Sequence, residues 1–269
     1  MTEKIKIITL CDLLFIFILG VSGSVENALI SNTVYYFAFL IPIALALGYI
    51  IQNNNSIDLK SVLSDFKITK EGAMLSLPII IPEIFIVLII SVGTNALMNL
   101  LGQTNTATFN ETFGYAVVIH ALIPAVLEEL LFRFIPVKIL AGKEKSAVIL
   151  SSLMFAFAHV NLFQIPHAFV AGLIFASVYI VTGSIIPTIV MHFLNNTVSL
   201  MTIYGIGRSW LMPICISLLI ISALIIILRR KVYIKSFKSI IQSKYIAIGY
   251  PPLLFAILSL ILSISVFFV

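Results

Sequence analysis

Nine long apolar segments dominate this sequence and limit what the chain can fold into. Most reach the roughly 20 residues that an α-helix needs to cross about 30 Å of hydrocarbon. Only 10% of the residues are charged, whereas an ordinary soluble domain has about 25%. The sequence therefore predicts an all-α polytopic membrane protein, a bundle of about eight to nine transmembrane helices. The segments are 7–24, 33–51, 73–100, 113–138, 146–163, 167–182, 185–204, 210–228 and 246–268.

The basic residues outside the apolar segments fall on one side of this arrangement. If the N-terminus is cytoplasmic, the outer loops hold only Arg208, and the inner segments hold the other loop cations. Cytoplasmic loops of membrane proteins carry this excess of Lys and Arg. We expect a multi-pass protein of the cell membrane with nine spans; with eight, the last segment lies on the membrane or re-enters it. The inner cations are Lys4, Lys6, Lys60, Lys67, Lys70, Lys138, Lys143, Lys145, Arg229, Arg230, Lys231, Lys235, Lys238 and Lys244.

The net charge of +5 follows from this distribution and gives no indication of nucleic-acid binding. The basic residues lie where cytoplasmic loops meet anionic lipid. The densest run, RRKVYIKSFKSIIQSK, fits lipid contact, with a protein partner as the lesser alternative.

The chain reads as one integrated membrane domain in three parts. Residues 1–112 hold about three N-terminal helices with a cytoplasmic loop at 52–72, residues 113–204 hold four helices, and residues 205–269 hold the C-terminal helices. We expect a short interfacial helix in the loop. Its lipid-facing residues would be Ile57, Leu59, Val62, Leu63 and Phe66.

The fourth apolar segment, VVIHALIPAVLEELLFRFIPVKI, contains three charges. Glu129 and Arg133 are four residues apart, which places them on one helix face in the better orientation for an ion pair. Glu128 is then left over, about 100° further round the helix. A buried carboxylate without a counter-ion suits a general base or acid. The alternative is that all three charges form one packing network between helices.

A proline interrupts the same segment. Pro124 lacks an N–H, so it frees the carbonyl of His120 and kinks the helix. His120 is either a neighbour of Glu128 or a solvated or packed histidine in the outer half of the helix.

Two later helices each carry a polar pair at helical spacing. His159 shares a face with Phe155, and His192 shares one with Asn196. Either pair can serve interhelical hydrogen bonding. At 1.5 Å per residue, however, Glu128 and both histidines fall at about 10–20 Å from the inner helix ends. A common depth favours a single site formed by helix packing.

These residues form three ordered motifs: EExxxR at 128–133, FxxxH at 155–159 and HxxxN at 192–196. The ordered set, over about residues 113–204, resembles the CPBP intramembrane proteases. That family includes the CAAX prenyl endopeptidase (Ras-converting enzyme) and the bacterial Abi and bacteriocin-immunity proteins.

The resemblance implies a catalytic role for each position. Glu128 resembles the glutamate that activates water, with His159 assisting it. His192 and Asn196 resemble the pair that stabilises the oxyanion, and Glu129 with Arg133 resembles the supporting ion pair. The family is often called a metalloprotease, and two His with one Glu is a zinc ligand set. The chain has no HExxH, so we favour the metal-free scheme and leave a divalent metal such as zinc open.

We therefore expect an intramembrane endopeptidase that cleaves a peptide or a membrane protein. An Ile-, Asn- and Lys-rich composition favours a bacterial source, with a leader peptide or pheromone precursor among the substrates. A non-enzymatic immunity or scaffold protein of the same family is the alternative. A transporter is disfavoured because the chain shows no internal repeat. The sequence leaves the oligomeric state open.

Overall fold

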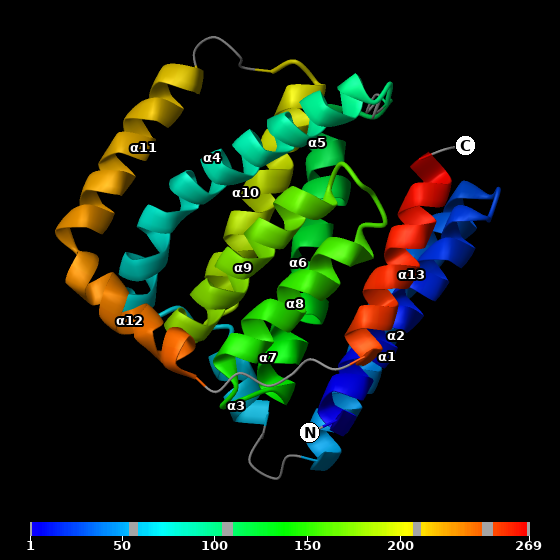
Figure 1. Cartoon of the computed structure of the whole chain (residues 1–269), viewed down its shortest axis with the longest axis horizontal. Helices are drawn as coiled ribbons and strands as arrows, with labels where there is room; N and C mark the ends of the chain where they lie inside the picture. The colour runs from blue at the N-terminus through cyan, green and yellow to red at the C-terminus, as the bar shows by residue number, and fades with distance from the viewer. Residues whose placement is uncertain (1, 54–58, 104–109, 207–210, 244–249, 268–269) are drawn as a thin grey trace.

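A computed structural model of the chain describes residues 2–53, 59–103, 110–206, 211–243 and 250–267, and every element in these ranges is helical (Figure 1). The helices are α1 Thr2–Gly23, α2 Ala28–Asn53, α3 Leu59–Ser64, α4 Lys70–Leu100, α5 Phe113–Ala116, η1 Val117–Leu122, α6 Ile123–Glu129, η2 Leu130–Phe134, α7 Ile135–Ile139, α8 Glu144–Ala158, α9 Ile165–Thr182, α10 Ile186–Ile203, α11 Leu211–Leu228, α12 Arg230–Gln242 and α13 Tyr250–Phe267. The all-α fold is confirmed.

Each of the nine apolar segments contains a helix in the described part of the chain. Among the described residues, five helices are long and apolar enough to cross a membrane, or up to six if the bent pair α11 and α12 counts as one span. α8 is shorter than expected and ends at Ala158 after 15 residues. A tight turn joins α9 to α10, because Gly183 ends α9 in the left-handed region with φ 64°. The number of eight to nine spans stays a prediction.

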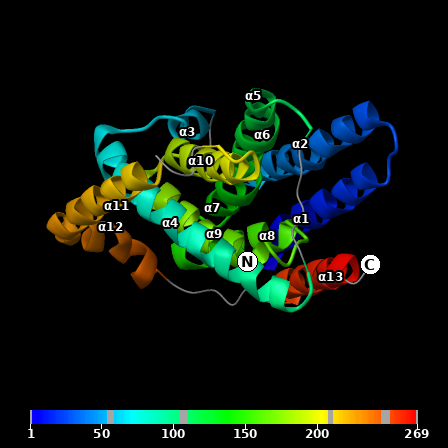
Figure 2. The ribbon, with the colours of Figure 1, turned by 90° about the horizontal axis from the view of Figure 1, so that it is seen from above.

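The helices form three groups side by side (Figures 1 and 2). α1, α2 and α13 make one flank, α4, α11 and α12 make the other, and α5 to α10 lie between them. α13 contacts α1 and α8, whereas α11 contacts α4 and α12. The central group therefore has helices on both sides.

Large apolar side chains cover the outside of this bundle. Phe17, Ile89 and Leu100 are 69%, 67% and 85% exposed. Exposed apolar surface on this scale is costly in water and favourable in lipid. The protein is membrane-embedded.

The loop at 52–72 contains the predicted short helix, α3. Leu63 and Phe66 are exposed as expected, whereas Val62 packs against the core. The Asp65 carboxylate contacts Lys138 Nζ at 2.7 Å and accepts a hydrogen bond from Tyr179. This cluster ties the loop to α7 and α9. Ile57 lies outside the described residues, as do Arg208 and Lys244 from the topology argument.

The basic run at 229–244 continues α11 into α12 through a bend of 78°. α12 contacts α8 and α9, and the Tyr233 hydroxyl donates to the Leu75 carbonyl at 3.1 Å. A basic helix turned away from its apolar neighbour α11 fits the predicted contact with anionic lipid.

The packing of α8 against α9 depends on one glycine. A Cβ atom at Gly172 would lie 2.9 Å from Ser152 Cα, closer than two such atoms can approach. Small residues allow this close helix contact in membranes.

Gly172→Ala should destabilise the fold by about 1–3 kcal/mol, because the added methyl group forces the two backbones apart. A thermal unfolding curve in detergent measures this. Gly93→Ala is the control: it is a helical glycine in α4, and a methyl group added there would meet no neighbouring atom within 4 Å, so the change should be neutral or stabilising. Equal behaviour of the two variants would contradict this account of the packing.

Candidate active site

The predicted ion pair of the fourth segment is present and buried. Arg133 Nη1 lies 3.2 Å from Glu129 Oε1, and neither side chain is exposed. The two groups lack the alignment of a hydrogen bond, and all three guanidinium nitrogens are without one among the described residues. The pair is therefore held by charge and by its surroundings.

Two aromatic rings surround the guanidinium group of Arg133. Its Cζ lies 3.7 Å from the ring centre of Phe155 and 5.3 Å from that of Phe175. A cation above an aromatic face is attracted by the ring quadrupole, most strongly where water is excluded. Phe155 and Phe175 thus replace part of the hydration that Arg133 loses.

The helix that carries this pair is irregular at two places. η1 and η2 are π-helical, with Ile123 N–H bonded to Val118 O and Ile135 N–H bonded to Leu130 O. Each π segment ends two residues before a proline, Pro124 or Pro136. A proline cannot complete the ordinary helical hydrogen bond, and the wider turn adds a residue there. The structure thus has a π turn shortly before Pro124, where the sequence predicts a kink.

His192 on α10 lies between the two glutamates. Its Nδ1 is 2.9 Å from Glu129 Oε1, and its Nε2 is 3.6 Å from Glu128 Oε2. Glu129 Oε1 thus contacts both Arg133 and His192. The expectation that Glu128 has no charged neighbour is wrong, because His192 lies next to it. The Glu128 side chain is 16% exposed.

His159 lies at the end of α8, with its ring against that of Phe155. Its Nδ1 lies 2.8 Å from the Phe155 carbonyl oxygen, which can only accept, so Nδ1 carries the hydrogen. No hydrogen bond or ion pair joins it to Glu128 in the described part of the chain. Phe155 links the two histidines instead, with ring centres 4.7 Å from His159 and 5.4 Å from His192.

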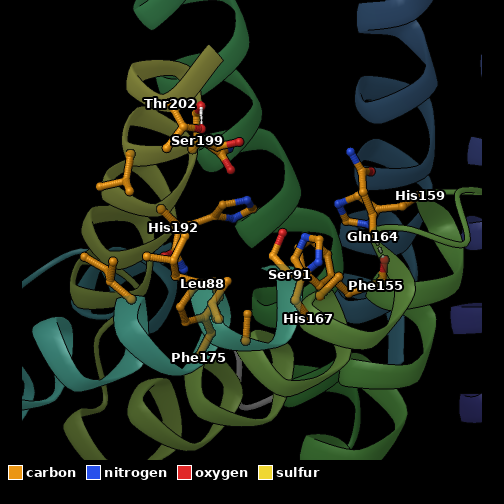
Figure 3. Close-up of a pocket in the computed structure, with 17 residues that line it drawn as sticks. Leu88, Ser91, Phe155, His159, Gln164, His167, Phe175, His192, Ser199 and Thr202 are labelled. Carbon is orange, nitrogen blue, oxygen red and sulfur yellow. Dashed lines mark hydrogen bonds between the residues drawn. The ribbon is translucent and has the colours of Figure 1, made fainter. Parts of the chain in front are cut away.

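A cavity of about 180 Å³ lies between α4, α8, α9 and α10 (Figure 3). His192 projects from one side of it, and His159, Gln164 and His167 project from the other (Figure 3). Asn196 also lines it, but Glu128, Glu129 and Arg133 do not. His192 therefore connects the buried charges with the cavity. The lining residues are Ile84, Val87, Leu88, Ser91, Phe155, His159, Gln164, His167, Ala168, Ala171, Phe175, His192, Asn195, Asn196, Val198, Ser199 and Thr202.

His120 is remote from this group. Its Nε2 lies 3.5 Å from Glu111 Oε1, with both side chains more than a third exposed. The pKa of Glu111 lies below its ordinary value. The largest cause is a hydrogen bond from the Glu111 backbone, and the contact with His120 is a smaller one. This partial exposure fits the second alternative for His120, a solvated or packed histidine.

The spacing of the motifs did not single out three contributors to the site. Phe175 stacks near His192 at 5.5 Å, His167 reaches the cavity, and Asn195 hydrogen-bonds Glu83 at 2.6 Å. An aromatic residue in an apolar helix carries no signal of its own. Asn195 and Asn196 are adjacent in the sequence, but only Asn196 fits the HxxxN spacing.

The described residues do not gather a metal site. No group of three His, Cys, Asp or Glu side chains in the described ranges could hold a metal ion. Glu128, His159 and His192 do not form such a group, and the Phe155 ring packs against both imidazoles. No step of the chemistry below is derived through a metal.

The centre of this helical membrane protein is thus a buried carboxylate–imidazole–guanidinium group beside a cavity. Residues 110–198 match the family model described as Rce1-like, Type II CAAX prenyl endopeptidase. This range contains all six residues predicted for the site, so the resemblance inferred from the motifs is confirmed there. No curated protein and no solved structure matches the chain. The match supports a peptidase of the CAAX type in general.

Arg133→Met should destabilise the protein by about 3–5 kcal/mol, because it leaves the Glu129 carboxylate buried without its counter-ion. Thermal unfolding in detergent measures the loss. Adding Glu129→Gln removes the second charge, and the double variant should recover much of the stability. A double variant as unstable as Arg133→Met would show that the fold needs the ion pair for another reason.

Proposed function

We propose that this protein is an intramembrane endopeptidase that hydrolyses a peptide bond with a water molecule activated by Glu128. The observation that carries the proposal is the buried row Arg133–Glu129–His192–Glu128, which meets the cavity at His192. Charges buried in this way are costly in a membrane protein and mark functional sites.

Glu128 is the general base of this scheme. It takes a proton from water as the oxygen attacks the carbonyl carbon, and it returns that proton to the leaving amine as the C–N bond breaks. His159 donates through Nδ1 to Phe155 O, so its Nε2 is the nitrogen able to orient the water. In this scheme the water lies between Glu128 and His159.

His192 and Asn196 stabilise the developing oxyanion. His192 Nδ1 lies 2.9 Å from Glu129 Oε1, and its Nε2 acts as a donor in the imidazolium form. The Asn196 amide supplies a second donor from the same face of α10. Glu129 orients His192, and Arg133 balances the charge of Glu129.

The scheme uses each of the six residues once and forms no covalent intermediate. Zinc is the alternative that the donor types allow. The packing of the Phe155 ring against both imidazoles favours the metal-free reaction.

The substrate is a peptide or a segment of a membrane protein, since the site lies within the bundle. A leader peptide or a peptide pheromone precursor in a bacterial cell membrane fits, with the N-terminus of the enzyme in the cytoplasm. Membrane lipids surround the protein and contact its basic loops.

Glu128→Gln should lower the turnover rate by about 10²–10⁴-fold, because it removes the base and preserves the shape. His192→Ala and His159→Ala should each lose the same product. The measurement compares secreted peptides and membrane-protein fragments between a deletion strain and strains that express each variant, with protein amounts checked by blot.

His120→Ala is the matched control, since this histidine lies in the same helix as Glu128 but outside the site. It should behave as the wild type does. If the Glu128, His159 and His192 variants complement the deletion as well as the wild type does, the function of the protein is not catalysis. A non-enzymatic immunity or scaffold protein is then the better account.

A further inference from the structure

One buried carboxylate stands outside the site described above. Glu83 lies in the middle of α4, outside the range that matches the family model, and it has no exposed surface. Its Oε1 accepts a hydrogen bond of 2.6 Å from Asn195 Nδ2, and its Oε2 has no hydrogen-bond partner among the described residues. Burying a carboxylate costs several kcal/mol, so the contact with Asn195 calls for an explanation.

This contact determines which way the amide of Asn195 points. The two ends of an amide are alike in shape, and the partners decide their orientation. In this hydrogen bond Nδ2 donates and Glu83 Oε1 accepts, so the carbonyl oxygen Oδ1 faces away from Glu83. Asn195 also lines the cavity, and Oδ1 is the end of its amide that Glu83 does not engage.

The next residue, Asn196, lines the same cavity and is a donor in the proposed reaction. α10 thus presents an acceptor and a donor at successive positions. The main chain of a peptide presents N–H and C=O groups in the same alternation. An acceptor beside the oxyanion donors therefore suits a main-chain N–H close to the bond that is cut.

A main-chain N–H reaches such an acceptor only where the substrate is unwound. In a helix the N–H is already bonded within its own segment, and a helix is about 10–12 Å wide, too wide for a cavity of about 180 Å³. An extended segment in a membrane must find partners for its N–H groups, because lipid offers none. Asn195 offers one.

We propose that Asn195 binds the substrate through a main-chain N–H next to the scissile bond, and that Glu83 is the positioning residue that holds Asn195 for this contact. The inference rests on the proposed endopeptidase function and adds to it how the substrate is held. α4, which supplies Ile84, Val87 and Leu88 to the cavity wall, thereby also supplies the residue that orients a polar contact.

The test uses purified full-length protein in detergent and a peptide library from a digested proteome. The bond cut best by the wild type is remade in a short peptide series, in which each amide N–H near that bond is N-methylated in turn. Methylation at one position should slow cleavage about fivefold or more, the value of one hydrogen bond. The Asn195→Ala variant should cleave the unmethylated peptide more slowly by the same factor. Methylation of the sensitive amide should then not slow its cleavage further.

Glu83→Gln tests the positioning role. Its amide can accept or donate, so Asn195 is no longer held one way, and KM should rise about two- to fivefold with kcat little changed. Glu83→Ala should match Asn195→Ala. Thr197→Ala is the control, because its hydroxyl bonds Phe193 O in its own helix and does not line the cavity; it should keep the full methylation effect.

The outcomes separate the two proposals. If the wild type cuts peptides and every methylation effect persists in Asn195→Ala, the substrate contact is overturned and the endopeptidase stands. If Glu83→Gln lowers kcat and leaves KM unchanged, Glu83 acts on the catalytic charges and its positioning role is overturned. If the wild type cuts no peptide of the library, the proposed function is overturned, and this inference with it. Thermal unfolding of each variant shows that it is folded.

Discussion

The burial of one guanidinium group organises the centre of this protein. Arg133 has no exposed surface, and a cation in that position must be balanced within the bundle. Glu129 supplies the charge at 3.2 Å, and the Phe155 ring covers the group at 3.7 Å. Each of these partners then holds a histidine, because Glu129 bonds His192 and Phe155 packs against both His159 and His192. Three helices are joined through one side chain.

This arrangement separates the costly charges from the place where a substrate would lie. The ion pair is closed off behind His192, and the cavity is lined by imidazole, amide, hydroxyl and apolar groups. Because His192 contacts both carboxylates and the cavity, those charges can act on a bound group while they stay buried. The design keeps strong electrostatics in a site of low polarity, where they act with little screening.

The bundle around the centre has a clear division of tasks. The matched range 110–198 carries the acid–base residues, and α4 lies across it and completes the cavity wall. Asp65 and Lys138 join the loop after α2 to α7, and the close contact at Gly172 sets α8 against α9. Parts of the chain without a motif thus position the residues that have one.

The sequence by itself determined the helical class, the Glu129–Arg133 pair and the membership of His192 and Asn196 in one face of α10. These features follow from apolar segment length and from helical spacing, which are local properties of the chain. Only the tertiary structure decided that His192 is the neighbour of Glu128, that His159 lies across Phe155, and that Glu83 reaches Asn195. Such contacts join helices far apart in the sequence, and the π turns before Pro124 and Pro136 rotate the side chains between them. A regular helical spacing cannot anticipate either effect, because both arise from how the helices pack.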